Sequence, residues 1–221
     1  MKWDRGVSYD TLKHQFLTFF KYRLADYLRK PSKNRAKSLL YVSTALIQLA
    51  NGLRAGETLI SMRKLYDVQE NPKQIEIFVF KKKKRKRLKD GRVVEKRLSE
   101  FEKRKVIIPE TVRVHKNYLH EWFARGFGLP DKFMPIKFEN PFEREKNVKE
   151  YKKCVRKYGM WLEKNFNVNS HTLRYAFNNK FLELAPTELV AKFQGRTDLN
   201  VLLEYVRERK ATQLFNELID F

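Results

Sequence analysis

Residues 75–112 read IEIFVFKKKKRKRLKDGRVVEKRLSEFEKRKVIIPETV. The run opens with a short β-rich segment, IEIFVF, and closes with a second apolar segment, KVII, which Pro109 ends. Between them lie a dense set of basic residues and the turn-forming pair Asp90-Gly91. Two such apolar runs around a turn predict an extended antiparallel β-hairpin over about residues 75–109, with a cationic tip.

The segment from Lys81 to Lys105 concentrates the charge of the chain. It holds fourteen Lys or Arg and four Asp or Glu, and therefore ten of the 22 net positive charges. A basic run of this kind can be a solvated loop or a localisation signal. On a β-ribbon it can instead follow the phosphates of a DNA groove and bind them with salt-dependent, sequence-independent affinity. We expect such DNA contacts from Lys82, Lys84, Arg85, Lys86 and Arg87.

The rest of the chain has the apolar spacing of helices. Pro31 ends the first of them, and Gly52 stands where the second would be capped. The polar segment 31–38 predicts a hinge, and the proline-containing segment 128–142 predicts a linker. The expected fold class is therefore α+β, mainly α-helical with a small antiparallel sheet. The expected helices cover residues 8–30, 35–51, 55–65, 112–127, 143–166, 170–184, 187–193 and 199–210, with a tail helix at 211–221.

The composition excludes several classes of protein. The 221 residues include 48 Lys or Arg against 26 Asp or Glu, a net charge of +22, and 42% are hydrophobic, which is enough for a packed core. A single cysteine, Cys154, excludes a disulfide framework and a cysteine-based zinc site, and four scattered histidines do not suggest another, so we expect no metal and no cofactor. No apolar run reaches the ~18–20 residues that cross a bilayer, and the N-terminus lacks a signal peptide. We expect an intracellular protein with nucleic acid as its first polyanionic partner and an anionic membrane surface as a second candidate.

Three short motifs lie outside the basic run. Ser170 is the expected N-cap of a helix that begins with His171 and carries Arg174 one turn later. The motifs are NGLRAGE at 51–57, SHTLRYAF at 170–177 and QGRTDLNVLLEYV at 194–206. Each alone is a common feature of a helix end or a helix face. Together, with the hairpin between the first two, they resemble the catalytic domain of the tyrosine recombinases, the phage-integrase family, over roughly residues 35–210. That family has a Gly-Leu-Arg-x-x-Glu box, a hairpin lysine, a His-x-x-Arg box, a Gly-His or Gly-Trp box and a tyrosine nine residues later.

The resemblance implies a site that cleaves and rejoins DNA without a metal, through a covalent 3′-phosphotyrosyl intermediate. Tyr205 would be the nucleophile, since a phenol oxygen can hold the phosphate covalently. Arg54 and Arg174 would clamp the nonbridging oxygens, because guanidinium groups offer planar, bidentate hydrogen bonds to the charge that develops there.

The resemblance also implies roles in proton transfer and support. A hairpin lysine would protonate the departing 5′ oxygen, and counting from the end of IEIFVF points first to Lys81 and second to Lys83. His171 would assist proton transfer and hydrogen-bond the phosphate. Glu57 would hold Arg54 or His171 in place.

Arg196 departs from the family pattern, because His or Trp usually occupies that position. An arginine can still donate to a phosphate oxygen, and divergent members, including integrases of archaeal viruses and plasmids, vary there. A catalytically impaired recombinase-like DNA-binding regulator therefore stays an alternative. So does a basic helical nucleic-acid protein unrelated to the family.

The expected organisation has three parts: an N-terminal helix and linker over residues 1–34, the recombinase-like domain over 35–210, and the tail helix over 211–221. In the family such a tail docks on a neighbouring protomer, so we expect a dimer or tetramer on double-stranded DNA, with a tail folded back on its own core as the alternative. Little precedes residue 35 to build the family's N-terminal clamp domain. The chain is either the catalytic domain of a longer protein or a minimal recombinase.

Overall fold

The computed structural model describes residues 7–68, 70–79, 84–87, 93–96, 102–117, 147–187 and 189–190. Helices dominate these residues, and two short antiparallel strand pairs accompany them. The expected mainly helical fold with a small antiparallel sheet is confirmed. No helix in this part of the chain is long and apolar enough to cross a membrane.

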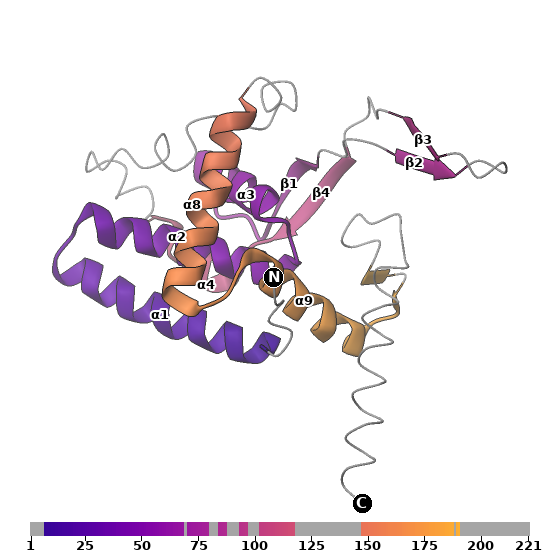
Figure 1. The fold of residues 1–221 in the computed structure, drawn as a ribbon. Coiled ribbons are helices and arrows are strands. Elements are labelled where there is room, and N and C mark those ends of the chain that lie inside the picture. Colours follow the sequence, from indigo (N-terminus) through magenta and orange to yellow (C-terminus); the bar gives the residue numbers. More distant parts are fainter. Residues whose placement is uncertain are drawn as a thin grey trace, which may run out of the picture.

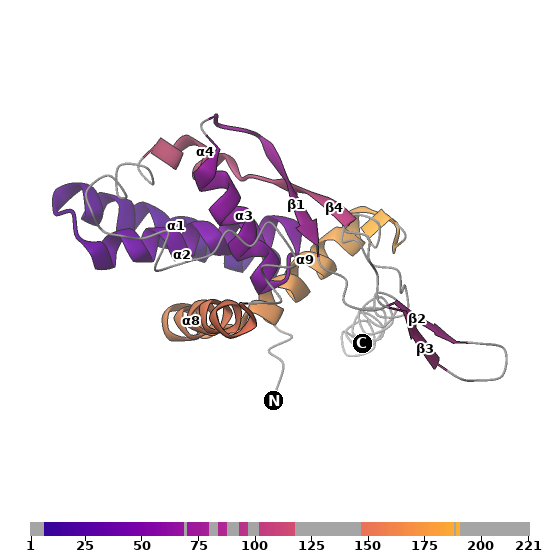
Figure 2. The same ribbon diagram turned by 90° about the horizontal axis from the view of Figure 1, so that it is seen from above.

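Two long helices, α1 (Tyr9–Arg29) and α2 (Lys33–Asn51), run side by side (Figures 1 and 2). Pro31 follows the end of α1, and Ser32 caps α2 at once by accepting a backbone N–H of its first turn. The predicted hinge over residues 31–38 is therefore wrong. Because a serine N-cap follows the proline directly, residues 33–38 of that polar segment form the start of α2, where Lys33, Asn34 and Lys37 are exposed and Ala36 is buried.

Helix α2 lies at the centre of the core. Every side chain from Leu39 to Leu49 is buried, and α1, α3 and α9 pack against it. A helix that is enclosed on all sides belongs to the interior of a domain. Its C-terminal end, at Asn51 and Gly52, is consequently held in place by the elements around it.

The predicted hairpin is present as two antiparallel strand pairs. Strand β1 (Gln74–Val79) pairs with β4 (Glu102–Ile107), and β2 (Lys84–Arg87) pairs with β3 (Val93–Lys96). The pair β2–β3 lies farther from the helices than β1–β4 (Figure 1). The expected bounds, residues 75–109, agree with the outer strands to within two residues.

One face of β1–β4 packs on the helices. Ile75 and Ile77 of β1 are buried, as are Arg104 and Val106 of β4, whereas the intervening side chains of β4 are exposed. This is the period-two alternation of a half-buried strand. The alternation places Arg104, a charged residue, on the apolar face of the sheet.

Further helices complete the described part of the chain. Phe166, at the end of α8, packs edge-on against Phe16 of α1 with the ring centroids 4.7 Å apart. The short helix α4 follows β4 in the chain, and residues 118–146 are outside the described residues. The bounds of these helices are Ala55–Asp67 for α3, Glu110–Val114 for α4, Val148–Phe166 for α8 and Ser170–Leu184 for α9.

Helix α9 has the bounds predicted from the sequence, but its N-cap differs. Asn169, not Ser170, is the cap, because its side-chain oxygen accepts the backbone N–H groups of His171 at 2.8 Å and Thr172 at 3.0 Å. Ser170 therefore becomes the first helical residue. The correction leaves His171 in the first turn of the helix.

Several predicted segments lie outside the described residues. They are most of the helix at 112–127, the linker at 128–142, the start of the helix at 143–166, the end of the helix at 187–193, the helix at 199–210 and the tail at 211–221.

Candidate functional site

The tight loop between α2 and α3 begins the candidate site. Gly52 has φ 56°, in the left-handed region, and ends α2. A Cβ added to Gly52 would lie 2.3 Å from Cδ1 of Phe177 in α9. Only glycine satisfies both the backbone angle and this close approach, so the loop lies directly against α9.

Arg54 ends this loop and is the N-cap residue of α3. Glu57, one turn later, reaches back to it: Oε2 accepts the backbone N–H of Arg54 at 3.1 Å, and Oε1 accepts from Nη1 at 2.8 Å. The side chain of Arg54 is 60% exposed, whereas that of Glu57 is 6% exposed. A buried carboxylate thus holds a guanidinium whose side chain is largely exposed.

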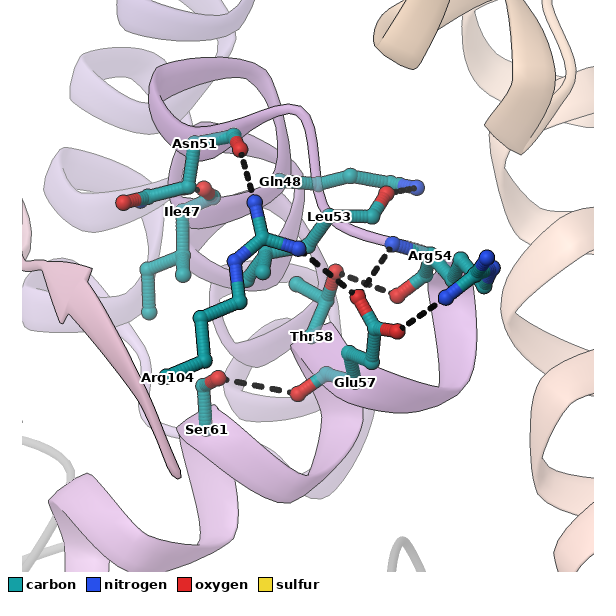
Figure 3. A network of polar contacts seen from close by, with 9 residues as sticks. All are labelled: Ile47, Gln48, Asn51, Leu53, Arg54, Glu57, Thr58, Ser61 and Arg104. Carbon is teal, nitrogen blue, oxygen red and sulfur yellow. Dashed lines mark hydrogen bonds and ion pairs between the residues drawn. The ribbon is translucent and has the colours of Figure 1, made fainter. Parts of the chain in front are cut away.

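The same carboxylate binds a second arginine from the sheet. Nη1 of Arg104 lies 3.2 Å from Oε2 of Glu57, and Nη2 donates to the backbone oxygen of Asn51 at 3.0 Å. Arg54 and Arg104 lie on opposite sides of Glu57 (Figure 3). Burial alone would raise the pKa of Glu57, but the charges of Arg104 and Arg54 outweigh burial and lower that pKa below its ordinary value. Glu57 is therefore ionised at neutral pH.

Gln48, buried in α2, joins the Arg54 loop to the start of α9. Its Nε2 donates to the backbone oxygen of Leu53 at 3.0 Å and to that of Ser170 at 3.1 Å. Its Oε1 accepts from the hydroxyl of Tyr158 in α8 at 2.7 Å. One side-chain amide thus sets the separation between the loop at Leu53 and the start of α9 at Ser170, two segments that lie far apart in the sequence.

His171 and Arg174 come from the first turns of α9. Arg174 is buried and His171 is exposed at the surface. Partial desolvation lowers the pKa of His171, and the positive charges of Arg174 and Arg54 lower it further. The charges of both motifs therefore act on one imidazole, which is neutral at pH 7 and has one ring nitrogen that donates and one that accepts.

The site has a positive potential from several sources. Helices α3 and α9 both begin here, next to the residues that Gln48 joins, and the N-terminus of a helix carries a partial positive charge. Arg54, Arg104 and Arg174 add three positive charges, of which the carboxylate of Glu57 neutralises one. Helix N-termini and guanidinium groups together suit a phosphate.

Of the residues predicted from the sequence, Arg54 and Glu57 are in direct contact, and Arg54 and Arg174 lie close enough to His171 for their charges to lower its pKa. The backbone of Lys84, Arg85, Lys86 and Arg87 forms β2, at a distance from this cluster along the hairpin. The other predicted residues, namely Lys81, Lys82, Lys83, Arg196 and Tyr205, lie outside the described residues. Within the described residues, no group of three or more His, Cys, Asp or Glu side chains could hold a metal ion.

Sequence reasoning missed Arg104 and Gln48. For Arg104 a signal existed: in the strand that ends KVII, alternation places it on the same face as Val106 and Ile108. For Gln48 there was none, because a polar residue in an apolar helix does not reveal which backbone groups it will meet.

The chain is similar to a curated protein named "Uncharacterized protein MJ0770", from Methanocaldococcus jannaschii. The two are 26% identical over 223 residues, which cover 99% of this chain and 89% of that protein. No protein-family model matches the chain, and no solved structure matches it. The similarity thus extends over nearly the whole chain, and the name of the relative states no activity.

Proposed function

We propose that the protein is a site-specific DNA recombinase or integrase with the catalytic-domain fold of the tyrosine recombinases. The observation that supports this proposal is that the charges of Arg54 and Arg174 both act on the imidazole of His171, although Arg54 comes from a motif far away in the sequence, and that Gln48 ties the two motifs together. The order and spacing of the motifs add Tyr205 and a hairpin lysine to the same site.

The substrate is a phosphodiester of double-stranded DNA. The phenol oxygen of Tyr205 attacks the phosphorus, the bond from phosphorus to the 5′ oxygen breaks, and the phosphate stays on the enzyme as a 3′-phosphotyrosine. Lys81 or Lys83 protonates the departing 5′ oxygen. A 5′ hydroxyl from another strand then reverses these steps and rejoins the DNA.

The described residues would stabilise the charge that develops during this reaction. Arg54 and Arg174 donate to the nonbridging oxygens, and the N-termini of α3 and α9 add a favourable field. His171, neutral at pH 7, can donate to the phosphate through one ring nitrogen while the other accepts a proton.

The basic hairpin would supply much of the affinity for DNA. Lys84 to Arg87 lie on a β-ribbon that projects beyond β1–β4 (Figure 1). Such a ribbon can follow a groove and release counterions from the phosphates. Self-association on DNA through residues 211–221 belongs to the same proposal.

A nicked duplex that traps the covalent intermediate tests the nucleophile. The duplex is selected by the protein itself from random DNA, and the nick lets the cleaved fragment diffuse away. The wild-type chain should form an adduct that survives SDS, and Tyr205→Phe should bind the same DNA without forming it. Tyr22→Phe, at an exposed tyrosine of α1, is the matched control and should keep the adduct. An adduct in Tyr205→Phe would remove Tyr205 from this role, and specific binding by a wild-type chain that forms no adduct would favour the regulator.

The two arginines are tested on the same duplex. Arg54→Ala and Arg174→Ala should each slow adduct formation by about 100-fold or more, because each removes a donor to the transition state. Arg63→Ala, at the far end of α3 where Arg63 pairs with Asp67, is the matched control and should react at the wild-type rate. Equal rates in Arg54→Ala and Arg63→Ala would contradict the clamp role.

A further inference from the structure

Arg104 is a charged side chain in an apolar position. It lies on β4 opposite Ile77 of β1, on the same face as Val106, and its side chain is only 5% exposed. A buried guanidinium strongly destabilises a fold unless it is paired and hydrogen-bonded. Its contacts with Glu57 and with the backbone of Asn51 are therefore what keep it there.

The carboxylate of Glu57 is divided between the two arginines. Oε2 receives the backbone N–H of Arg54 and Nη1 of Arg104, whereas Oε1 receives Nη1 of Arg54 (Figure 3). Arg104 thus fixes one oxygen of the carboxylate. The rotation of the carboxylate is then set, and with it the direction in which Oε1 holds the side chain of Arg54.

The charge balance points the same way. Glu57 with Arg54 alone would form a neutral pair, with little attraction for a phosphate. Arg104 adds a second positive charge, so that the cluster of three keeps a net charge of +1. Since Arg104 is buried and Arg54 is 60% exposed, the surplus is available at Arg54.

Arg104 also ties the hairpin to this cluster. It lies on β4, and the partner strand β1 ends at Val79, two residues before Lys81. Asn51 adds a second tie, because its side chain donates to the backbone oxygen of Ile107 at 2.8 Å and accepts the N–H of Ile107 at 2.8 Å. The base of the hairpin is therefore fixed on the same residues that hold Arg54.

We infer that Arg104 is a positioning residue that acts through Glu57 on Arg54, holding the Arg54 guanidinium in the direction and with the net charge that a phosphate requires. The inference rests on the proposed function for its catalytic consequence. The contact geometry itself is independent of that function.

A double-mutant cycle with Arg104→Met and Glu57→Gln tests the inference. Each single variant should slow adduct formation on the nicked duplex by about 10- to 100-fold, the usual effect of removing a supporting partner. The double variant should be no slower than the slower single variant, because both changes break one chain of contacts. Arg29→Met, at an arginine near the end of α1 whose side chain is 78% exposed, is the matched control and should leave the rate unchanged. Additive losses would overturn the inference.

A second measurement does not depend on cleavage. The titration of the Glu57 carboxyl group, followed by NMR, should move to higher pH in Arg104→Met, and the side-chain N–H signal of Arg54 should shift. Among the described residues, the charged groups that contact the carboxylate are Arg54, at the start of α3, and Arg104 from β4, so the loss of one should change the titration directly. Arg104→Lys keeps the positive charge but cannot contact Glu57 and the backbone oxygen of Asn51 through two separate nitrogens, so it should give an intermediate titration. This variant also provides the measurement if Arg104→Met does not fold.

The two proposals fail in different ways. If the wild-type chain forms no adduct on DNA that it binds, the recombinase proposal fails, and the Glu57 titration together with the Arg54 signal still decides the positioning role. If the adduct forms but neither signal changes in Arg104→Met or Arg104→Lys, the positioning role fails and the recombinase proposal stands.

Discussion

The loop that carries Arg54 and the start of α9 belong to one site, but they are held by different chemistry. The loop is held by ions, with Glu57 between Arg54 and Arg104. The start of α9 is held by neutral groups, with the amide of Gln48 between two backbone oxygens and the hydroxyl of Tyr158. The ionic part controls how much charge faces a phosphate, whereas the neutral part controls the distance between the two basic motifs.

The two parts should respond differently to pH. The pKa of Glu57 is lowered in the folded protein, so its contribution to stability is present above its ordinary value of 4.5 and is lost as the pH falls through the folded pKa. Gln48 does not titrate. Three changes test this contrast, in order of decreasing expected effect.

Gln48→Leu should give the largest loss of stability. It leaves the backbone oxygens of Leu53 and Ser170 and the hydroxyl of Tyr158 without this partner, and each buried polar group deprived of a partner costs about 1–3 kcal/mol. We expect the free energy of unfolding to fall by about 3 kcal/mol or more, equally at pH 6 and pH 8, in chemical denaturation. Gln15→Leu, at an exposed position of α1, is the control. A loss that varies with pH between these values would contradict the neutral role.

Gly52→Ala should have a smaller effect, at the contact between the two parts. The left-handed backbone and the overlap with Phe177 together should lower the free energy of unfolding by about 1–3 kcal/mol. Gly159→Ala is the matched control, because a Cβ there meets nothing within 4 Å in the middle of α8. That control should stabilise the protein by about 0.5–1 kcal/mol in the same measurement. Equal effects of Gly52→Ala and Gly159→Ala would show that the loop does not lie against α9.

Arg54→Ala should change the titration of His171, the smallest of the three effects. In the wild-type protein the pKa of His171 lies below 6.5, so the stability associated with its neutral form is present above pH 6.5 and is lost as the pH falls through the folded pKa. Removing the charge of Arg54 should raise that pKa toward its ordinary value, as seen in the imidazole NMR signals. Arg63→Ala should leave the titration where it is. If the titration of His171 does not change in Arg54→Ala, the loop that carries Arg54 does not lie close to His171.

The sequence predicted the local features of the fold well. Residues 170–184 were expected as a helix with the bounds that α9 has, and Gly52 was expected as the cap of α2, because apolar spacing and glycine act within a few residues. The predicted hinge at 31–38 is wrong because Ser32 caps α2 directly after Pro31, so that the polar residues after it are helical. The predicted N-cap of α9, Ser170, is wrong by one residue. Asn169 and Ser170 are both residue types that cap helices well, and the path of the backbone selects Asn169.

The supporting residues of the site were harder to predict. The motifs pointed to Arg54, Glu57, His171 and Arg174 because they are close in sequence within each box. Arg104 and Gln48 join segments 47 and 122 positions apart, and no local pattern specifies such a contact. The roles of Tyr205, Arg196 and the hairpin lysines stay predictions.

The side chain of Asn51 also protects the outer edge of strand β4 from pairing with a strand of another molecule. In a two-stranded sheet each strand has an open outer edge, which can pair with a strand from another molecule. At Ile107 the backbone N–H and C=O are both hydrogen-bonded to the side-chain amide of Asn51. The end of α2 thus makes, for one residue, the hydrogen bonds that a neighbouring strand would make. Ile107 is 48% exposed, and an unprotected edge at an exposed isoleucine would invite sheet extension and aggregation. The helix end closes that edge, so that strand addition at the base of the hairpin is blocked at Ile107.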